Sequence, residues 1–139
     1  MNERAASYPR PDPVAADDAR FWEFVATGEL CIQRCAECHT PRHPPRPVCA
    51  ACGATTVEWE PSSGRGEVWA KTVIHPPTLA AFASRTPYGA VVVRLEEGVF
   101  MVGNVIDVEP DELAVGMPVE VTIVEVEEGL HLPLFRPRW

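Results

Sequence analysis

Apolar and polar residues alternate along most of the second half of the chain, which is typical of half-buried β-strands. In GEVWAKTVIH, residues 66–75, this alternation predicts a strand with one face formed by Val68, Ala70, Thr72 and Ile74. Four further segments read as strands: YGAVVVRL, VFMVGNVIDV, PVEVTIVEV and LHLPLF. Glu-Glu-Gly turns at 96–98 and 127–129 separate two pairs of them. The fold class is therefore mainly β, and a five-stranded OB-fold barrel fits, as does an SH3-like barrel.

The N-terminal part of the chain has a helical period instead. In VAADDARFWEFVATG, residues 14–28, Phe21, Trp22 and Val25 fall near one helical face. Asp12-Pro13 offers an N-cap acceptor and a proline suited to the first helical position, and Gly28 suits the C-terminal cap. We expect a helix here, preceded by an unanchored arm. The helix either buries its aromatic side chains on its own domain or docks on a partner chain.

Two C-x-x-C pairs lie between the helix and the barrel, in CAECHTPRHPPRPVCAACG. Each pair places two sulfurs on one tight turn, and two facing turns form a tetrahedral site whose ligands are Cys35, Cys38, Cys49 and Cys52. The flanking segments ELCIQRC and TTVEWEP read as strands. We predict one structural Zn²⁺ per chain, with a closed shell that leaves no position for a catalytic water. Iron in a rubredoxin-like electron carrier uses the same four ligands, so iron is the alternative metal.

These segments divide the chain into three parts. We expect an N-terminal arm and helix at 1–28, a zinc ribbon at 29–61, and a barrel with a C-terminal tail at 62–139. The glycine- and serine-containing segment 62–66 is predicted to be a hinge, because it lacks the features of a phosphate-binding loop. Cys31 lies outside the cysteine pattern and is predicted to be a small core residue.

The charge of the chain argues against nucleic acid as a partner. The formal net charge is −8, and Asp107 to Glu128 contains eight acidic residues and no basic one. Nucleic-acid binding depends largely on lysine and arginine neutralising phosphates. An OB-fold nucleic-acid-binding module remains the alternative, with Trp69 and Tyr88 as stacking residues.

The sequence lacks features that are typical of membrane proteins, exported proteins and enzymes. No apolar run approaches the roughly 18 residues of a membrane span, and the N-terminus has no apolar stretch of a signal peptide. We therefore expect no membrane association and a cytoplasmic, reducing location, where metal binding is favoured over disulfides. His75 and His131 could each act as a general base, but no catalytic motif accompanies them.

The chain resembles one known family over about residues 20–137. The segments FWEFVATGEL, PRHPPRPVCAACG, SGRGEVWAKTVIH, PYGAVVVRLEEGV and LPLFRP occur in the order found in the zinc-ribbon/OB-fold acyl-CoA-associated proteins, a former domain of unknown function. The resemblance implies an N-terminal helix, a rubredoxin-like zinc ribbon and an OB barrel. It also implies a non-catalytic subunit docked on a thiolase-like enzyme: an acyltransferase, a ketothiolase or a retro-aldolase. The subunit would help to bind or channel acyl-CoA.

The resemblance extends to partners and to single residues. Some members bridge to a hot-dog-fold hydratase, as in bacterial steroid side-chain degradation. The partner interface is expected on the helix, on the ribbon arginines and on the tail; its helix and tail residues are Phe21, Trp22, Phe24, Phe135, Arg136 and Pro137. Arg42 and Arg46 are expected to meet CoA phosphates through charge-assisted hydrogen bonds. Aromatic and arginine residues in the ending LPLFRPRW are types enriched at interfaces, although a tail packed on its own barrel remains the alternative.

Overall fold

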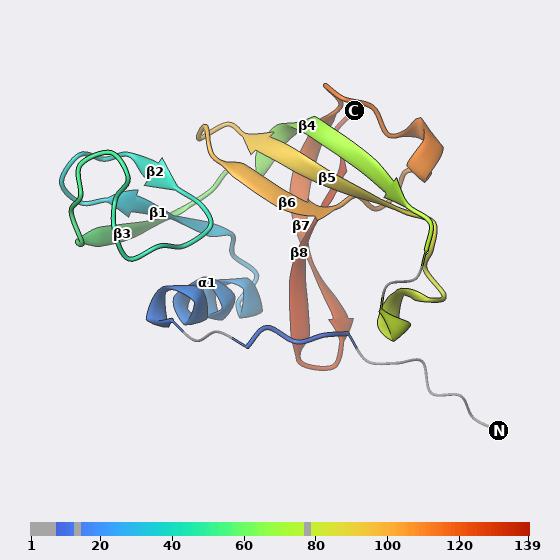
Figure 1. The fold of residues 1–139 in the computed structure, drawn as a ribbon, viewed down its shortest axis with the longest axis horizontal. Coiled ribbons are helices and arrows are strands. Elements are labelled where there is room, and N and C mark those ends of the chain that lie inside the picture. The colour runs from blue at the N-terminus through green and yellow to red at the C-terminus, as the bar shows by residue number, and fades with distance from the viewer. Residues whose placement is uncertain (1–7, 13–14, 77–78) are drawn as a thin grey trace.

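Two antiparallel sheets and one α-helix make up the described residues, 8–12, 15–76 and 79–139, of this computed structural model (Figure 1). The helix is α1 (Ala16–Ala26). The first sheet contains β1 (Cys31–Cys35), β2 (Pro41–Arg42) and β3 (Val57–Pro61). The second contains β4 (Arg65–Ile74), β5 (Tyr88–Leu95), β6 (Phe100–Asn104), β7 (Pro118–Glu127) and β8 (Leu130–Pro137). Two 3-10 helices, η1 (Ala80–Phe82) and η2 (Pro110–Glu112), lie in the connections.

The five-stranded sheet closes into an OB-fold barrel. Its strand order is β6-β5-β4-β7-β8. Val105, just after β6, forms a parallel bridge with Phe135 of β8, and the amide of Ile106 donates to the Phe135 carbonyl at 2.8 Å. The third and fifth barrel strands therefore meet, which gives the partly closed five-stranded barrel of the OB fold. This confirms the mainly β prediction and resolves the choice between the two barrel types.

A β-bulge in β4 changes which side chains share a face. Val68 pairs with Val93, but the next partner pair is Ala70 with Val92, so Trp69 is the extra residue. Val68 is buried, whereas Trp69 is 58% exposed. The predicted simple alternation of Val68 with Ala70 on one face was therefore wrong, because the inserted residue reverses the order of faces.

One hydrophobic core joins the helix, the first strand of the ribbon and the barrel. Phe21 and Val25 of α1 and Ile32 of β1 belong to the same buried cluster as the barrel residues, which include Val68, Val91, Val93, Leu95, Met101, Val119 and Phe135. Figure 1 shows α1 lying beneath the ribbon and beside the β7–β8 hairpin. The helix therefore covers apolar surface of its own chain.

Phe135 is fully buried and Phe21 is 5% exposed, so these two side chains pack in the core of this chain rather than on its surface. A Cβ atom on Gly103 would lie 2.9 Å from the Phe135 ring, so glycine is needed where β6 passes this side chain. The segment predicted to be a C-terminal tail forms strand β8. It packs on the barrel of its own chain, which was the alternative prediction. Trp139 remains 92% exposed.

The helix begins later than predicted. Ala15 occupies the N-cap position without a side-chain cap, so Asp12 is not the cap; the predicted helical residues Pro13 and Val14 lie outside the described residues. Gly28 has φ of 88°, as the predicted cap requires. None of the helices in the described ranges is long and apolar enough to cross a membrane.

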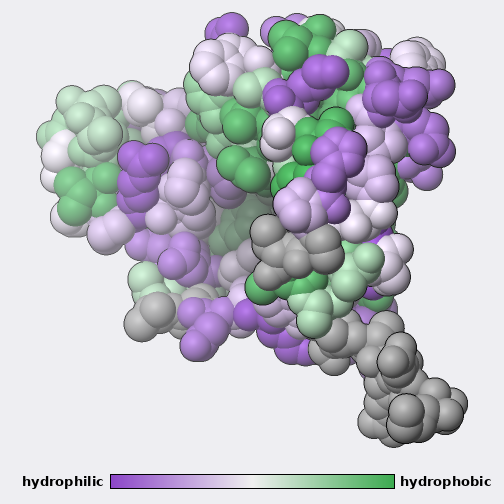
Figure 2. Space-filling view, turned by 45° about the vertical axis from the view of Figure 1, so that its right-hand side comes forward, coloured by the Kyte–Doolittle hydropathy of each residue, from purple (hydrophilic) through white to green (hydrophobic). Residues whose placement is uncertain are grey.

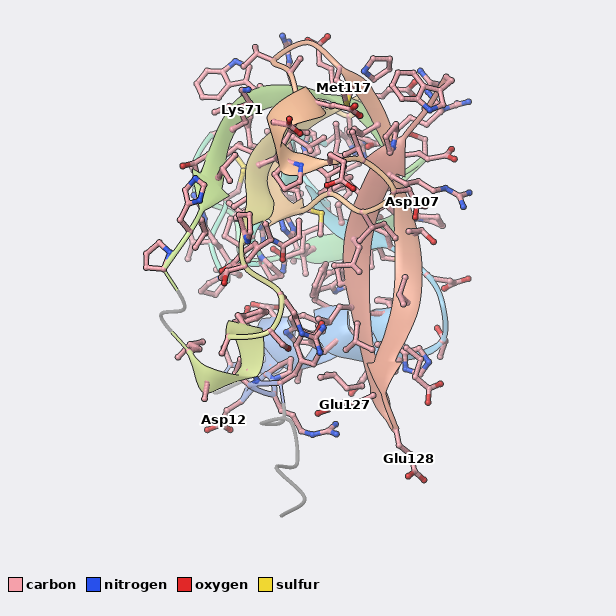
Figure 3. The ribbon with its side chains drawn as sticks, turned by 90° about the vertical axis from the view of Figure 1, so that its right-hand side faces the viewer. Asp12, Lys71, Asp107, Met117, Glu127 and Glu128 are labelled. Atoms are coloured by element: carbon pink, nitrogen blue, oxygen red, sulfur yellow. The ribbon has the colours of Figure 1, made fainter. Side chains whose placement is uncertain are left out.

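The described part of the N-terminal arm is anchored, contrary to expectation. Arg10 donates from Nη2 to Glu127 Oε1 and to the Glu128 carbonyl, both at 3.1 Å. Figure 3 shows Glu127 and Glu128 at the tip of the β7–β8 hairpin, at the same end of the molecule as Asp12. The tertiary contact with this hairpin holds the arm extended at the point where local sequence favours a helix start.

The segment predicted as a hinge is held by side chains of the barrel. Ser62 Oγ donates to Glu97 Oε1 at 2.8 Å, and Ser63 donates from its amide to Glu97 Oε2 and from Oγ to Glu96 Oε2. The Glu-Glu-Gly turn between β5 and β6 therefore accepts hydrogen bonds from the ribbon–barrel connection. The domain boundaries at 28/29 and 61/62 stay predictions.

Phe135→Ala should lower the free energy of unfolding by about 3–5 kcal/mol, because it leaves a cavity at the closure of the barrel. Urea denaturation followed by circular dichroism measures the change. The exposed aromatic Trp139→Ala is the control and should stay within about 0.5 kcal/mol of the parent. Equal stability of the two variants would show that Phe135 does not close the core.

Candidate metal centre

Four cysteine sulfur atoms converge at the end of the three-stranded sheet. The sulfurs of Cys35, Cys38, Cys49 and Cys52 all lie within 4.8 Å of one another, and the 35–52 and 38–49 sulfur pairs are each 3.6 Å apart. Four thiolates at 2.3 Å from a tetrahedral ion would be about 3.8 Å apart. The donor set and its spacing therefore fit a four-thiolate metal site.

Two equivalent turns hold these sulfurs in place. The amide of His39 donates to the Cys35 carbonyl at 2.9 Å, and the amide of Gly53 donates to the Cys49 carbonyl at 2.8 Å. His39 has φ of 64° and Gly53 has φ of 78°, so both turns reverse through a left-handed residue four positions after their first cysteine. The glycine is the residue that accepts this conformation without steric cost. The pairing of β1 with β3 brings the two turns together.

Half of the site is inside the protein and half is at its surface. Cys35 and Cys49 are buried, while Cys38 and Cys52 are exposed. Hydrogen bonding between the Cys38 sulfur and the Thr40 side chain, followed by that with the Thr40 backbone, lowers the pKa of Cys38 to about 6. Backbone hydrogen bonds from Cys52 and Ala51 lower the pKa of Cys49. Thiolates are the metal-binding form of cysteine, so these contacts favour that form at Cys38 and Cys49. At Cys52 a hydrogen bond from the Ala54 backbone is outweighed by the contacts with the Cys35 and Cys38 sulfurs, and the pKa rises to about 12.

Cys31 does not belong to this cluster. It is 2% exposed, and burial, with the nearby Glu29 carboxylate, raises the pKa of its thiol. It is therefore a core residue, as predicted, and not a ligand. With four thiolates the coordination shell is closed, so the metal would hold the ribbon together and would offer no position to a substrate.

Arg42 is part of the interior of the ribbon and not of its surface. Its exposed fraction is 8%; Nε donates to Gln33 Oε1 at 3.0 Å, and Nε and Nη2 donate to the Arg46 carbonyl at 3.1 and 2.9 Å. The Arg46 amide also donates to Gln33 Oε1 at 2.7 Å. Arg42 therefore fastens the proline-rich loop to β1, and its expected contact with CoA phosphates conflicts with this burial.

Gln33 is a buried structural contact of the ribbon that sequence reasoning missed. It is fully buried, and its side chain accepts hydrogen bonds from both arginines of the loop. A polar residue inside the apolar run ELCIQRC was the available signal, because a buried amide needs partners.

His43 connects the proline-rich loop to the helix. Its ring lies 5.3 Å from the ring of Phe21, centroid to centroid. Burial, assisted by the Arg46 charge, lowers the pKa of His43 to about 4. The imidazole is therefore neutral at pH 7 and packs, partly buried, against the helix.

The remaining residues of the predicted interface are distributed over two surfaces. On the helix, Trp22 packs against Phe21, and Phe24 packs against Trp59 with its ring centroid 4.3 Å from the Arg20 guanidinium carbon. On β8, Arg136 is ion-paired with Glu120 at 3.0 Å, and Pro137 is opposite Val119. The structure does not bring these two groups together into one exposed apolar patch.

A hollow of about 400 Å³ lies between the ribbon loop and the β5–β6 turn. Its lining includes Arg42, His43 and Arg46 on the ribbon and Val99 and Phe100 on the barrel. The Arg46 side chain is exposed and forms no hydrogen bond or ion pair within the described residues. This hollow is where the ribbon presents a free positive charge.

Family models match most of the chain. Residues 22–58 match a model described as the rubredoxin-like zinc ribbon domain of ChsH2, and residues 59–124 match the C-terminal OB-fold domain of ChsH2. Among solved structures, the chain is similar to a subunit of "Ltp2-ChsH2(DUF35) aldolase". The identity is 38%, the TM-score is 0.84, and the match covers 91% of this chain and 98% of that one.

Curated relatives divide into two groups by length. A probable enoyl-CoA hydratase alpha subunit of Thermomonospora curvata is 40% identical over 92% of this chain, and a 3-oxo-4,17-pregnadiene-20-carboxyl-CoA hydratase alpha subunit of Mycobacterium tuberculosis is 38% identical over 78%. The matches span only 40% and 34% of those two proteins. A DUF35 domain-containing scaffold protein of Pyrococcus furiosus is 33% identical, and the match covers 79% of this chain and 80% of that protein.

Cys49→Ser should abolish metal binding and unfold the ribbon, because three thiolates no longer close the site around the ion. We expect one zinc ion per chain in the parent, measured by inductively coupled plasma mass spectrometry. The matched control, Cys31→Ala, removes a buried sulfur outside the cluster and should keep the ion. An ion retained by Cys49→Ser, or iron in the parent, would contradict this prediction.

Proposed function

Because the chain belongs to the DUF35 family, with a ChsH2-type zinc ribbon and OB-fold domain, we propose that it is a non-catalytic subunit of a thiolase-superfamily enzyme. The partner would be an acyltransferase, a ketothiolase or a retro-aldolase that acts on acyl-CoA. One observation carries the proposal: the match to the aldolase subunit extends over 98% of that subunit, and its name pairs ChsH2(DUF35) with Ltp2. The archaeal relatives are named as scaffold proteins.

The chemistry of the metal site supports a structural role. Four thiolates leave no open coordination position, and a zinc ion has no redox chemistry of its own.

Two histidines were considered as a general base. His131 lies beside Glu125 at 3.3 Å on the β7–β8 hairpin, and His75 is exposed at the end of β4. The catalytic groups would therefore belong to the partner. An iron-loaded electron carrier and a nucleic-acid-binding module remain the alternatives.

Two relatives named as hydratase alpha subunits suggest a second partner. The chain corresponds to a minor part of their length, so their hydratase activity does not transfer to it directly. A hot-dog-fold hydratase that acts in sequence with the thiolase-like enzyme would account for both kinds of relative. The pregnadiene-carboxyl-CoA in one relative's name makes steroid side-chain degradation the pathway we propose.

Arg46 is the residue that we propose for contact with CoA. Its guanidinium is exposed at the mouth of the hollow between ribbon and barrel, whereas the guanidinium of Arg42 is held inside by Gln33. Arginine binds phosphate through charge-assisted hydrogen bonds, which are stronger than neutral ones. Arg42 would act indirectly, by fixing the loop that carries Arg46.

Affinity purification of the tagged chain from its native host should recover a thiolase-like enzyme in a constant ratio to the tagged chain. Mass spectrometry identifies the partner, and thioester turnover should be found in the complex but not in the purified chain alone. Turnover by the isolated chain, or recovery without any thiolase-like enzyme, would refute the proposal.

Arg46→Ala should weaken binding of CoA to that complex by about tenfold, because one charge-assisted contact is lost. Isothermal titration calorimetry with free CoA measures the affinity. The control is Arg20→Ala, which removes an exposed arginine on α1 that is ion-paired with Glu23. Equal CoA affinity for the parent and Arg46→Ala would remove Arg46 from the proposal.

A further inference from the structure

Three large apolar side chains stand exposed together on the outer face of the barrel. Trp69 is 58%, Phe100 42% and Val102 74% exposed. The Trp69 and Phe100 rings are 5.1 Å apart, centroid to centroid, in an edge-on arrangement. Figure 2 shows exposed apolar side chains over the barrel in the upper part of the molecule. We call the outer face of β4, β5 and β6 around these three residues the outer sheet face.

Strand register shows that these residues form one surface. Val102 pairs with Val92 and Phe100 pairs with Arg94 across β5 and β6, and register partners point to the same side of a sheet. Ala70 pairs with Val92 across β4 and β5. A shallow apolar depression of about 240 Å³ lies here, and its lining includes Ala70, Val92 and Val102. The bulge in β4 places Trp69 on this surface, next to Phe100.

Free arginines border the outer sheet face. Arg94 is opposite Phe100 in the register, and Arg94 and Arg138 line the same hollow of about 500 Å³. Neither side chain forms a hydrogen bond or an ion pair with the described residues, and Glu67, opposite Arg94 on β4, is also unpaired there. Arg46 lies beyond Phe100 across the ribbon hollow. Glu67 and Glu96 line the same hollow as Arg94 and Arg138, and Glu96 is paired with Arg65. Among the described residues the border therefore carries both signs of charge, with the unpaired arginines in excess of the unpaired Glu67.

We propose that the outer sheet face is the surface that binds the thiolase-like enzyme, an inference that rests on the proposed function. Exposed aromatic residues bordered by arginines have the composition of interface hot spots. Unpaired guanidinium groups bind carboxylates in bidentate geometry, so the complementary surface of the enzyme is apolar at its centre and carries carboxylates at its rim. Arg46 would then meet CoA phosphates at the margin of the interface.

The helix is a weaker candidate for this surface. Phe21 is buried in the core, Trp22 and Phe24 are half-buried against neighbouring rings, and Arg20 is already paired with Glu23. The tail is likewise a weaker candidate for the interface, because Phe135 is buried and Arg136 is paired with Glu120. The outer sheet face has both free charge and exposed aromatic area.

The test uses the full chain and the thiolase-like enzyme that co-purifies with it from the native host. Trp69→Ser combined with Phe100→Ser should lower the affinity for that enzyme by at least about 100-fold, because two central contacts are lost. Leu79→Ser, which removes another half-exposed apolar side chain away from this face, should leave it unchanged. Arg94→Glu should weaken binding by about tenfold at low salt and less at high salt, while Arg20→Glu should not.

The outcomes separate this proposal from the proposed function. If the parent binds the thiolase-like enzyme and the folded, metal-loaded double variant binds equally well, the assigned surface is wrong and the function stands. If the parent recovers no thiolase-like enzyme, both fail. Val102→Arg changes a side chain that is 74% exposed, and it tests the same surface if the double variant does not fold. A parent that forms a dimer which the double variant loses, or that binds single-stranded oligonucleotides through Trp69, would also overturn the assignment.

Discussion

The convergence of four cysteine sulfurs holds the two turns of the ribbon together at the end of its sheet. The ribbon sheet is small, and its strand β1 contributes Ile32 to a core whose other members come from the helix and the barrel. An ion bound by the two turns would fix the far end of the sheet, and folding and metal binding would then be one event. The buried Gln33–Arg42 contact then fixes the proline-rich loop against β1. The barrel and the helix share one hydrophobic core with this ribbon.

Features that depend on local sequence were predictable. Paired cysteines two residues apart indicate a tetrahedral thiolate site, and alternating segments between glycine-containing turns indicate the five barrel strands. The strand β5 and the ligand cluster were found where the sequence indicated them. Gly28 could also be assigned from local rules, since helices commonly end on a left-handed glycine.

Features that depend on contacts between distant segments were not predictable from local pattern. The bulge that turns Trp69 outward interrupts an otherwise regular alternation, and no residue type marks its position. Arg42 was read as a surface cation, because its partners, Gln33 and the Arg46 carbonyl, become apparent only when the loop folds back on β1. Phe135 lies near the end of the chain, but the closing of the barrel over Gly103 buries it. Asp12 is not the predicted N-cap of the helix, and the arm that contains it is held by the contact of Arg10 with the β7–β8 hairpin.

The serine–glutamate contacts between the ribbon–barrel connection and the β5–β6 turn restrict rotation of the ribbon relative to the barrel. These contacts hold the ribbon–barrel connection against the β5–β6 turn within this chain. Association with another protein then requires little reorientation, and less conformational entropy is lost on binding. A protein with such a fixed shape can impose its own geometry on a larger assembly.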